Sequence, residues 1–269
     1  QRSGWRWNTA SAFLKPVKSR ANLQVMTGAQ ADRVLFEGNR ATGIAFIKDG
    51  QPHQVLADAE VILTAGAIGS PHLLQVSGVG PGAVLQEHGV AVQHDIPGIG
   101  ENLQDHLQLR CAYKVQGVKT LNQSSQGLFN KAKIGLEYLL TRRGPMSMAP
   151  SQLGVFTKSD PALETPDLEY HVQPLSLNKF GEPLDTFPAF TASVCNVRPE
   201  SRGTVRLASP EARQQPVIAP NYLSTEGDRR VAARSIQVTR EIVGQLPLAK
   251  YQPVEFRPGM SFQSDEELA

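Results

Sequence analysis

Residues 60–78 combine three local signals in a fixed order, and this order restricts the folds open to the chain. A short apolar run at residues 61–63 leads into a turn of small residues at 65–67. Ser70 then fits a helix N-cap, and Pro71 fits the first helical position, where its missing N–H costs least. A strand that passes through a glycine turn into a helix brings N–H groups and a positive dipole end to one place. The pattern predicts either a site for an anionic ligand such as a dinucleotide or a structural turn that binds nothing.

Two longer segments carry a more specific signal. Residues 66–80 read GAIGSPHLLQVSGVG, and residues 97–106 read PGIGENLQDH. Both resemble signature segments of the glucose–methanol–choline (GMC) oxidoreductases, in the family's order and at the expected distance. The resemblance extends along nearly the whole chain, including PESRGTVRLASP at residues 199–210. It implies FAD-dependent oxidation of an alcohol to a carbonyl compound, in the choline-dehydrogenase-like branch of the family.

The N-terminal 106 residues are predicted to form part of an FAD-binding domain. Residues 5–20 have the apolar spacing of a helix, and residues 22–27 alternate like a strand. Turn signals, including Lys48-Asp49-Gly50, separate the segments that follow and favour a β-meander. The expected strands of this meander cover residues 33–36, 41–47, 54–57 and 60–64.

Within this domain we select candidate cofactor contacts. The resemblance places Ala31 where a backbone group contacts adenine, and the alternative is a strand residue that only fills space. Small residues at Ala65 and Gly66 permit close approach of the backbone to a ligand. Asn102 follows a glycine turn and is either a flavin-side contact or a side chain that satisfies nearby backbone groups. The six candidates are Ala31, Ala65, Gly66, Ser70, Pro71 and Asn102.

Residues 107–269 are predicted to form a substrate-binding domain. Strands are expected from Leu107, Leu153, Asp167, Phe190 and Gly203, with helices from Gly127 and Thr225. The fold class is therefore α+β. A mostly antiparallel, multi-stranded sheet should carry helices on one face, beside the β-meander and βα-turn remnant of the FAD-binding domain.

Four residues of this second domain are candidate substrate contacts. The resemblance places a cavity-lining loop at residues 144–152, although methionines in a loop also commonly pack beneath it. His171 lies in an alternating strand and either faces the cavity or has a structural role. The four candidates are Met146, Met148, Gln152 and His171.

Composition excludes several classes of partner. The net charge of +2 gives no reason to expect nucleic acid. The only two cysteines, Cys111 and Cys195, lack metal-ligand spacing and are expected to be buried free thiols, so no metal is expected. No apolar run approaches the roughly 20 residues of a membrane span. We expect a cytoplasmic protein with a small-molecule alcohol as its partner. Peripheral membrane association and the oligomeric state stay open.

Two expected features are absent. No G-x-G-x-x-G follows a strand near the N-terminus, and no histidine follows His171. In the family, a late histidine handles the hydroxyl proton, so the resemblance implies a catalytic histidine beyond Ala269 and no catalytic role for His106. We therefore expect a central fragment that is inactive alone and binds FAD weakly or not at all. The alternatives are a relative of the FAD-containing hydroxynitrile lyases and a non-catalytic ligand-binding module.

Overall fold

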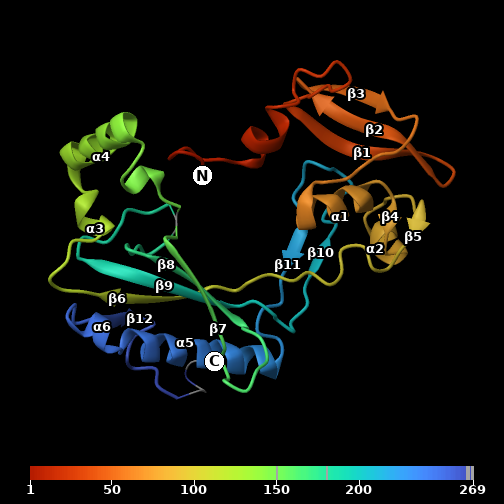
Figure 1. Cartoon of the computed structure of the whole chain (residues 1–269). Helices are drawn as coiled ribbons and strands as arrows, with labels where there is room; N and C mark the ends of the chain where they lie inside the picture. The colour runs from red at the N-terminus through yellow and green to blue at the C-terminus, as the bar shows by residue number, and fades with distance from the viewer. Residues whose placement is uncertain (150, 180, 265–266, 268–269) are drawn as a thin grey trace. The chain divides into compact units, whose positions relative to one another are not determined.

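The computed structural model describes residues 1–149, 151–179, 181–264 and 267. The chain divides into two compact units (Figure 1). Unit 1 comprises Gln1–Ser19, His106–Glu200 and Thr225–Ala269, and unit 2 comprises Arg20–Asp105 and Ser201–Ser224. The units do not coincide with the predicted ranges 1–106 and 107–269, because residues 1–19 and 106 lie in unit 1 and residues 201–224 lie in unit 2. The assignment of the two ranges to cofactor and substrate stays a prediction.

Unit 1 is built around a five-stranded antiparallel sheet in the order β12-β6-β9-β8-β7. Helix α5 lies along one face of this sheet (Figure 1). The predicted class, α+β with an antiparallel sheet, is confirmed. The elements of unit 1 are a π-helical turn at Ala10–Leu14, β6 (Leu109–Lys114), α3 (Leu121–Ser124), α4 (Gly127–Thr141), a 3₁₀ turn at Pro145–Ser147, β7 (Leu153–Thr157), β8 (Leu168–Gln173), β9 (Ala189–Asn196), α5 (Glu226–Val243), α6 (Leu246–Ala249) and β12 (Val254–Arg257).

Helix α5 begins as its sequence predicts. The Thr225 hydroxyl accepts a hydrogen bond from the Asp228 N–H at 3.1 Å, as in a capping box. The buried side of α5 includes Ile236 and Val238, which pack against the apolar face of the sheet. The helix thus shields this face from water, whereas α4 has no buried residue.

Unit 2 contains the predicted β-meander, a three-stranded antiparallel sheet in the order β1-β2-β3. Helix α1 packs on β1 through a core formed by Val34, Leu73 and Val76 with Leu85 and Leu207. The elements of unit 2 are β1 (Ala29–Glu37), β2 (Arg40–Lys48), β3 (Gln51–Leu56), α1 (Gly66–Val76), β4 (Val79–Gly80), α2 (Gly82–Glu87), β5 (His94–Asp95), β10 (Thr204–Arg206) and β11 (Val217–Ala219).

A buried glutamine holds β10 within unit 2. The Gln75 side chain is fully buried; its amide nitrogen donates to the Val205 carbonyl at 2.9 Å, and its amide oxygen accepts from the Leu207 N–H at 2.9 Å. The Val205 N–H donates to the carbonyl of Gly100 at 2.7 Å. The prediction that the strand from Gly203 joins the large sheet was wrong, because these bonds tie it to α1, β10 pairs with β11, and Gly203 itself bridges to Leu103.

Other expected elements of the N-terminal region are shorter or absent. The helix predicted for residues 5–20 is a single turn at Ala10–Leu14 with no buried residue, and just before it the Asn8 side-chain oxygen accepts from the Ser11 N–H at 2.9 Å. In the described part of the chain, residues 22–27 and 60–64 are not paired in any sheet. A strand requires a hydrogen-bonding neighbour, so alternation alone did not suffice there. No described helix is both long enough and apolar enough to cross a membrane.

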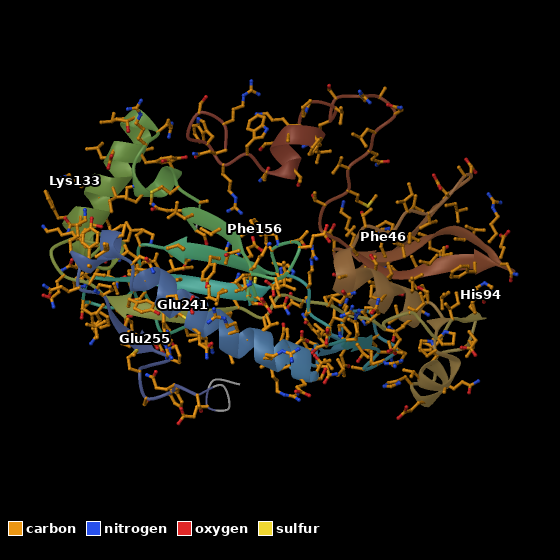
Figure 2. The ribbon with its side chains drawn as sticks, turned by 60° about the horizontal axis from the view of Figure 1, so that its bottom comes forward. Phe46, His94, Lys133, Phe156, Glu241 and Glu255 are labelled. Carbon is orange, nitrogen blue, oxygen red and sulfur yellow. The ribbon has the colours of Figure 1, made fainter. Side chains whose placement is uncertain are left out.

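A buried ion pair joins α5 to β12 in unit 1. Two of the three guanidinium nitrogens of Arg240, Nε and Nη2, donate to the Glu255 carboxylate at 2.9 and 2.8 Å, and the Tyr113 hydroxyl donates to it at 3.2 Å. Figure 2 labels Glu255, which lies on β12 at the edge of the five-stranded sheet. Burial alone would raise the pKa of Glu255, but the hydrogen bonds and charge of Arg240 outweigh it and hold the pKa below its ordinary value.

This lowered pKa makes the stability of unit 1 depend on pH. The contribution of a carboxylate with a lowered pKa is fully present above its unfolded pKa, 4.5 for glutamate, and is lost as pH falls through the folded value. At neutral pH we expect a lower melting temperature for Glu255→Gln than for the parent chain, with the difference shrinking as the pH is lowered below 4.5. Melting curves across this pH range provide the measurement, and a difference that stays constant with pH would contradict the assignment.

The Gln75 bridge gives a second prediction. Gln75→Leu keeps the volume of the side chain but leaves the Val205 carbonyl and the Leu207 N–H buried without a partner, at a cost of about 1–3 kcal/mol for each group. Urea unfolding should therefore show a clear loss of stability. The matched control is Gln86→Leu, at an exposed position of α2, which should change stability by less than about 0.5 kcal/mol. Equal effects of the two substitutions would contradict the role given to the bridge.

Candidate functional site

The start of helix α1 is the first candidate site, and it differs in detail from the prediction. Ala65 precedes the helix, and Gly66 begins it with a φ of +79°. Ser70 is therefore inside the helix rather than at its N-cap, and its hydroxyl accepts from the Ala65 N–H at 3.0 Å. Pro71 lies in the second turn instead of the first position. Gly66 adopts this left-handed φ without steric cost, so the chain can turn sharply into the helix four residues before Ser70.

This helix start presents unsatisfied donors. The first four N–H groups of a helix have no partner within it, and here they belong to residues 66–69. No side chain caps the helix at Ala65, and both Ala65 and Gly66 are exposed. A Cβ added to Gly66 would meet nothing within 4 Å. The arrangement fits an anionic group of a dinucleotide such as FAD, because N–H donors and the positive helix end converge on open space.

The other two cofactor candidates also lie in unit 2. Ala31 pairs with Phe46 across the meander, just before a register shift, and its half-buried side chain packs against the core beneath α1. Asn102 is exposed with a φ of +61°, and its carbonyl accepts from the Gln104 amide at 3.4 Å. Neither position excludes the expected backbone contact, and both roles stay predictions.

Beside α1, unit 2 contains a hollow of about 490 Å³ that the sequence did not predict. Its lining includes Gly28, Gly69, His72 and Arg213. Burial lowers the pKa of His72, and its buried Nε2 has no hydrogen-bond partner among the described residues. A single histidine within a helix gives no sequence signal that its side chain will be buried beside a hollow, so His72 was not predicted.

The second candidate site is the polar face of the five-stranded sheet. Residues opposite each other on neighbouring antiparallel strands share a face. Ser193 of β9 lies opposite Arg110 on one side and His171 on the other. In the same way Thr191 lies opposite Gln173, and Cys195 opposite Glu169. The face that α5 covers is apolar, and the opposite face carries the polar side chains Arg110, Glu169, His171, Gln173, Thr191, Ser193 and Cys195, of which Gln173, Thr191, Ser193 and Cys195 are buried.

Titratable groups gather on this face. The His171 Nε2 lies 3.3 Å from the Glu169 Oε1. One ligand-type atom from each of His106, Glu169 and Cys195 lies within 4.8 Å of the other two. Cys111 and Cys195 are both buried and neither forms a disulfide, as predicted. Cys111 lies on the α5 face, where burial raises its pKa to about 12. The sequence indicated only His171; the alternation of β8 is the signal that could also have pointed to Glu169 and Gln173.

The predicted loop residues divide into two groups. The Gln152 N–H donates to the Val172 carbonyl at 2.9 Å, and the Gln152 amide contacts the Met148 sulfur. The neighbouring Ser151 hydroxyl accepts from the Gln173 amide at 3.3 Å. The structure therefore brings Met148 and Gln152 to the end of β8 that bears Gln173. Met146 lies in the exposed 3₁₀ turn, and no described contact joins it to the sheet.

Comparison with known proteins identifies the class to which this architecture belongs. The N-terminal and C-terminal domain profiles of the GMC oxidoreductases match residues 1–108 and 199–269. The oxygen-dependent choline dehydrogenase of Pectobacterium carotovorum is 42% identical over 98% of this chain and 47% of its own length. The mitochondrial choline dehydrogenase of Mus musculus is 40% identical over 98% of this chain and 44% of its length.

Solved structures agree with this class. Pyridoxine 4-oxidase from Mesorbium loti superposes with a TM-score of 0.82 and 30% identity, over 99% of this chain and 48% of that one. A formate oxidase from Aspergillus oryzae, at 22% identity and a TM-score of 0.83, supports the fold alone. The chain spans about half the length of the curated relatives it matches. It belongs to the GMC oxidoreductase family.

Proposed function

We propose that this chain contributes to an FAD-dependent oxidoreductase that converts an alcohol to an aldehyde or ketone. The observation that carries the proposal is the exposed, uncapped start of α1, which offers four N–H donors beside small residues. Membership of the GMC family supports a flavin oxidoreductase role. FAD, when bound, would supply the acceptor for the hydride that leaves the alcohol carbon.

On the cofactor side, we assign Ala65 and Gly66 to close backbone approach and the N–H groups that follow them to an anionic group of FAD. Ser70 and Pro71 support this turn from inside the helix rather than by contact with the ligand, since the Ser70 hydroxyl is engaged by Ala65. Ala31 and Asn102 are assigned to the same cofactor through their backbone groups.

On the substrate side, we assign the polar sheet face of unit 1 to the alcohol. His171 and Gln152 would orient its hydroxyl group by hydrogen bonding, while Met148 and Met146 would shape an adaptable wall. The relatives named choline dehydrogenase make choline, a small amino alcohol, the first substrate to test. Because the chain spans about half of these relatives, we further propose that it binds FAD weakly and does not turn over alcohol alone.

The α1 assignment predicts how glycine substitutions change FAD affinity. Gly66→Ala places a Cβ on left-handed backbone, which costs about 1–2 kcal/mol and displaces the turn from its donor geometry. We expect FAD binding, followed by flavin fluorescence, to weaken at least about fivefold, because the free chain relaxes this strain and FAD binding must restore it.

Gly38→Ala is the matched control for this titration. Gly38 also has a positive φ, +56°, and a Cβ there would likewise meet nothing within 4 Å, but it lies in the turn between β1 and β2. Its affinity for FAD should equal that of the parent chain. Equal affinities for all three proteins would refute the α1 assignment, and choline-dependent dye reduction by the isolated chain would refute its inactivity.

A further inference from the structure

Helix α4 turns its apolar side to solvent. At 100° per residue, Leu128, Leu136, Leu139 and Leu140 share one stripe with Phe129. These side chains are among the most exposed of the chain, with Leu128 at 87%, Phe129 at 81% and Leu140 at 75%. The half-buried positions Asn130, Ile134 and Tyr138 lie on the opposite side. An ordinary surface helix has the reverse arrangement, so packing within unit 1 does not account for this stripe.

Positive charge flanks the exposed stripe. Lys131 and Lys133 border it on its two sides, and Arg142 and Arg143 follow its C-terminal end, against a single acidic residue, Glu137, on the helix. Figure 2 labels Lys133, which projects from α4. Long basic side chains beside an apolar stripe extend their charge toward phosphate groups while their stems stay in apolar surroundings.

The N-terminal segment of unit 1 adds aromatic residues to the same region. The Arg142 guanidinium lies 4.0 Å from the Trp5 ring centroid, and the Tyr138 hydroxyl donates to the Gly4 carbonyl at 3.1 Å. Trp5 and Trp7 are half exposed, at 53% and 43%. Residues 1–19 contain no acidic residue and four basic ones. Tryptophan favours the boundary between lipid headgroups and acyl chains.

We propose that this region, the α4 patch, docks on the surface of an anionic membrane. The patch consists of Leu128, Phe129, Leu136, Leu139 and Leu140 with Trp5 and the flanking basic residues Lys131, Lys133, Arg142 and Arg143. An in-plane helix buries its apolar stripe at the acyl boundary while lysine and arginine engage anionic headgroups. In this arrangement the helix lies on the membrane surface and does not cross it.

Charge argues against a second copy of the chain as the occupant. Two α4 patches facing each other would bring eight basic side chains of like sign together, with one glutamate from each helix to offset them. Such juxtaposition is unfavourable in an interface that excludes water. An anionic lipid surface supplies the opposite charge and an apolar layer at once.

The chain carries its own probe for the test. Trp5 and Trp7 are its only tryptophans, so intrinsic fluorescence reports this region. The chain is mixed with vesicles of pure phosphatidylcholine or of equal parts phosphatidylcholine and phosphatidylglycerol, and binding is measured by co-sedimentation. We expect binding and a blue shift of emission with the mixed vesicles only, and weakening by salt.

Two patch variants locate the surface. Lys131→Glu with Lys133→Glu should weaken binding at least about tenfold, because each basic charge near an anionic surface contributes about a fivefold factor. Leu136→Glu with Leu140→Glu should abolish binding. All four positions are exposed, so circular dichroism and melting should be unchanged.

The control is Leu246→Glu on α6, which is 88% exposed and lies outside the patch. It should bind like the parent chain. The proposal is overturned if the parent chain does not bind mixed vesicles, if pure phosphatidylcholine binds it equally, or if the patch variants bind normally. It is also overturned if light scattering shows a dimer that the leucine substitutions dissociate while vesicle binding is absent, since the occupant is then a second copy.

Discussion

The Gln75 amide is the interaction on which the organisation of unit 2 depends. One side chain satisfies a carbonyl and an N–H of the strand segment around β10, which is separated from α1 by about 130 residues of sequence. Gly100 completes the contact, because a Cβ there would lie 2.2 Å from the Val205 oxygen and 2.6 Å from the Gln75 nitrogen. These close approaches fix the C-terminal part of α1. The N-terminal end of the same helix carries the N–H groups of residues 66–69.

Unit 1 follows a different rule, the separation of polarity between the two faces of one sheet. Tyr170, Ala192 and Val194 are buried beneath α5, so their neighbours in the alternation must point to the other side. His171 and Ser193 therefore meet on a polar face without any sequence motif that joins them. The apolar face packs against α5 and supplies stability, whereas the opposite face carries hydrogen-bonding groups.

The sequence predicts local structure well where a local signal decides it. The Thr225 cap, the hairpin at Lys48-Asp49-Gly50 and the alternation of β8 all depend on neighbouring residues, and each is present. Where two local signals competed, the sequence was misleading. Ser70 and Pro71 have the pattern of a helix start, but the helix begins one turn earlier, at Gly66. Contacts between distant segments were not predicted. Examples are β10, which is held by Gln75, and β12, in which the charged residue Glu255 occupies a buried position and so breaks the expected alternation of apolar and polar residues.

For the candidate site, the small residues at Ala65 and Gly66 were identifiable from sequence because the turn is local. The cluster of His106, Glu169 and Cys195 was not, because the register of β8 and β9 sets Glu169 opposite Cys195 and His106 joins them from outside the strands. The most direct test of the account follows backbone amide resonances of the 269-residue chain during titration with FAD. The account predicts progressive shifts at residues 66–69 in fast exchange, with Gly38 unchanged. Saturable FAD binding that shifts other residues and leaves 66–69 unaffected would contradict it.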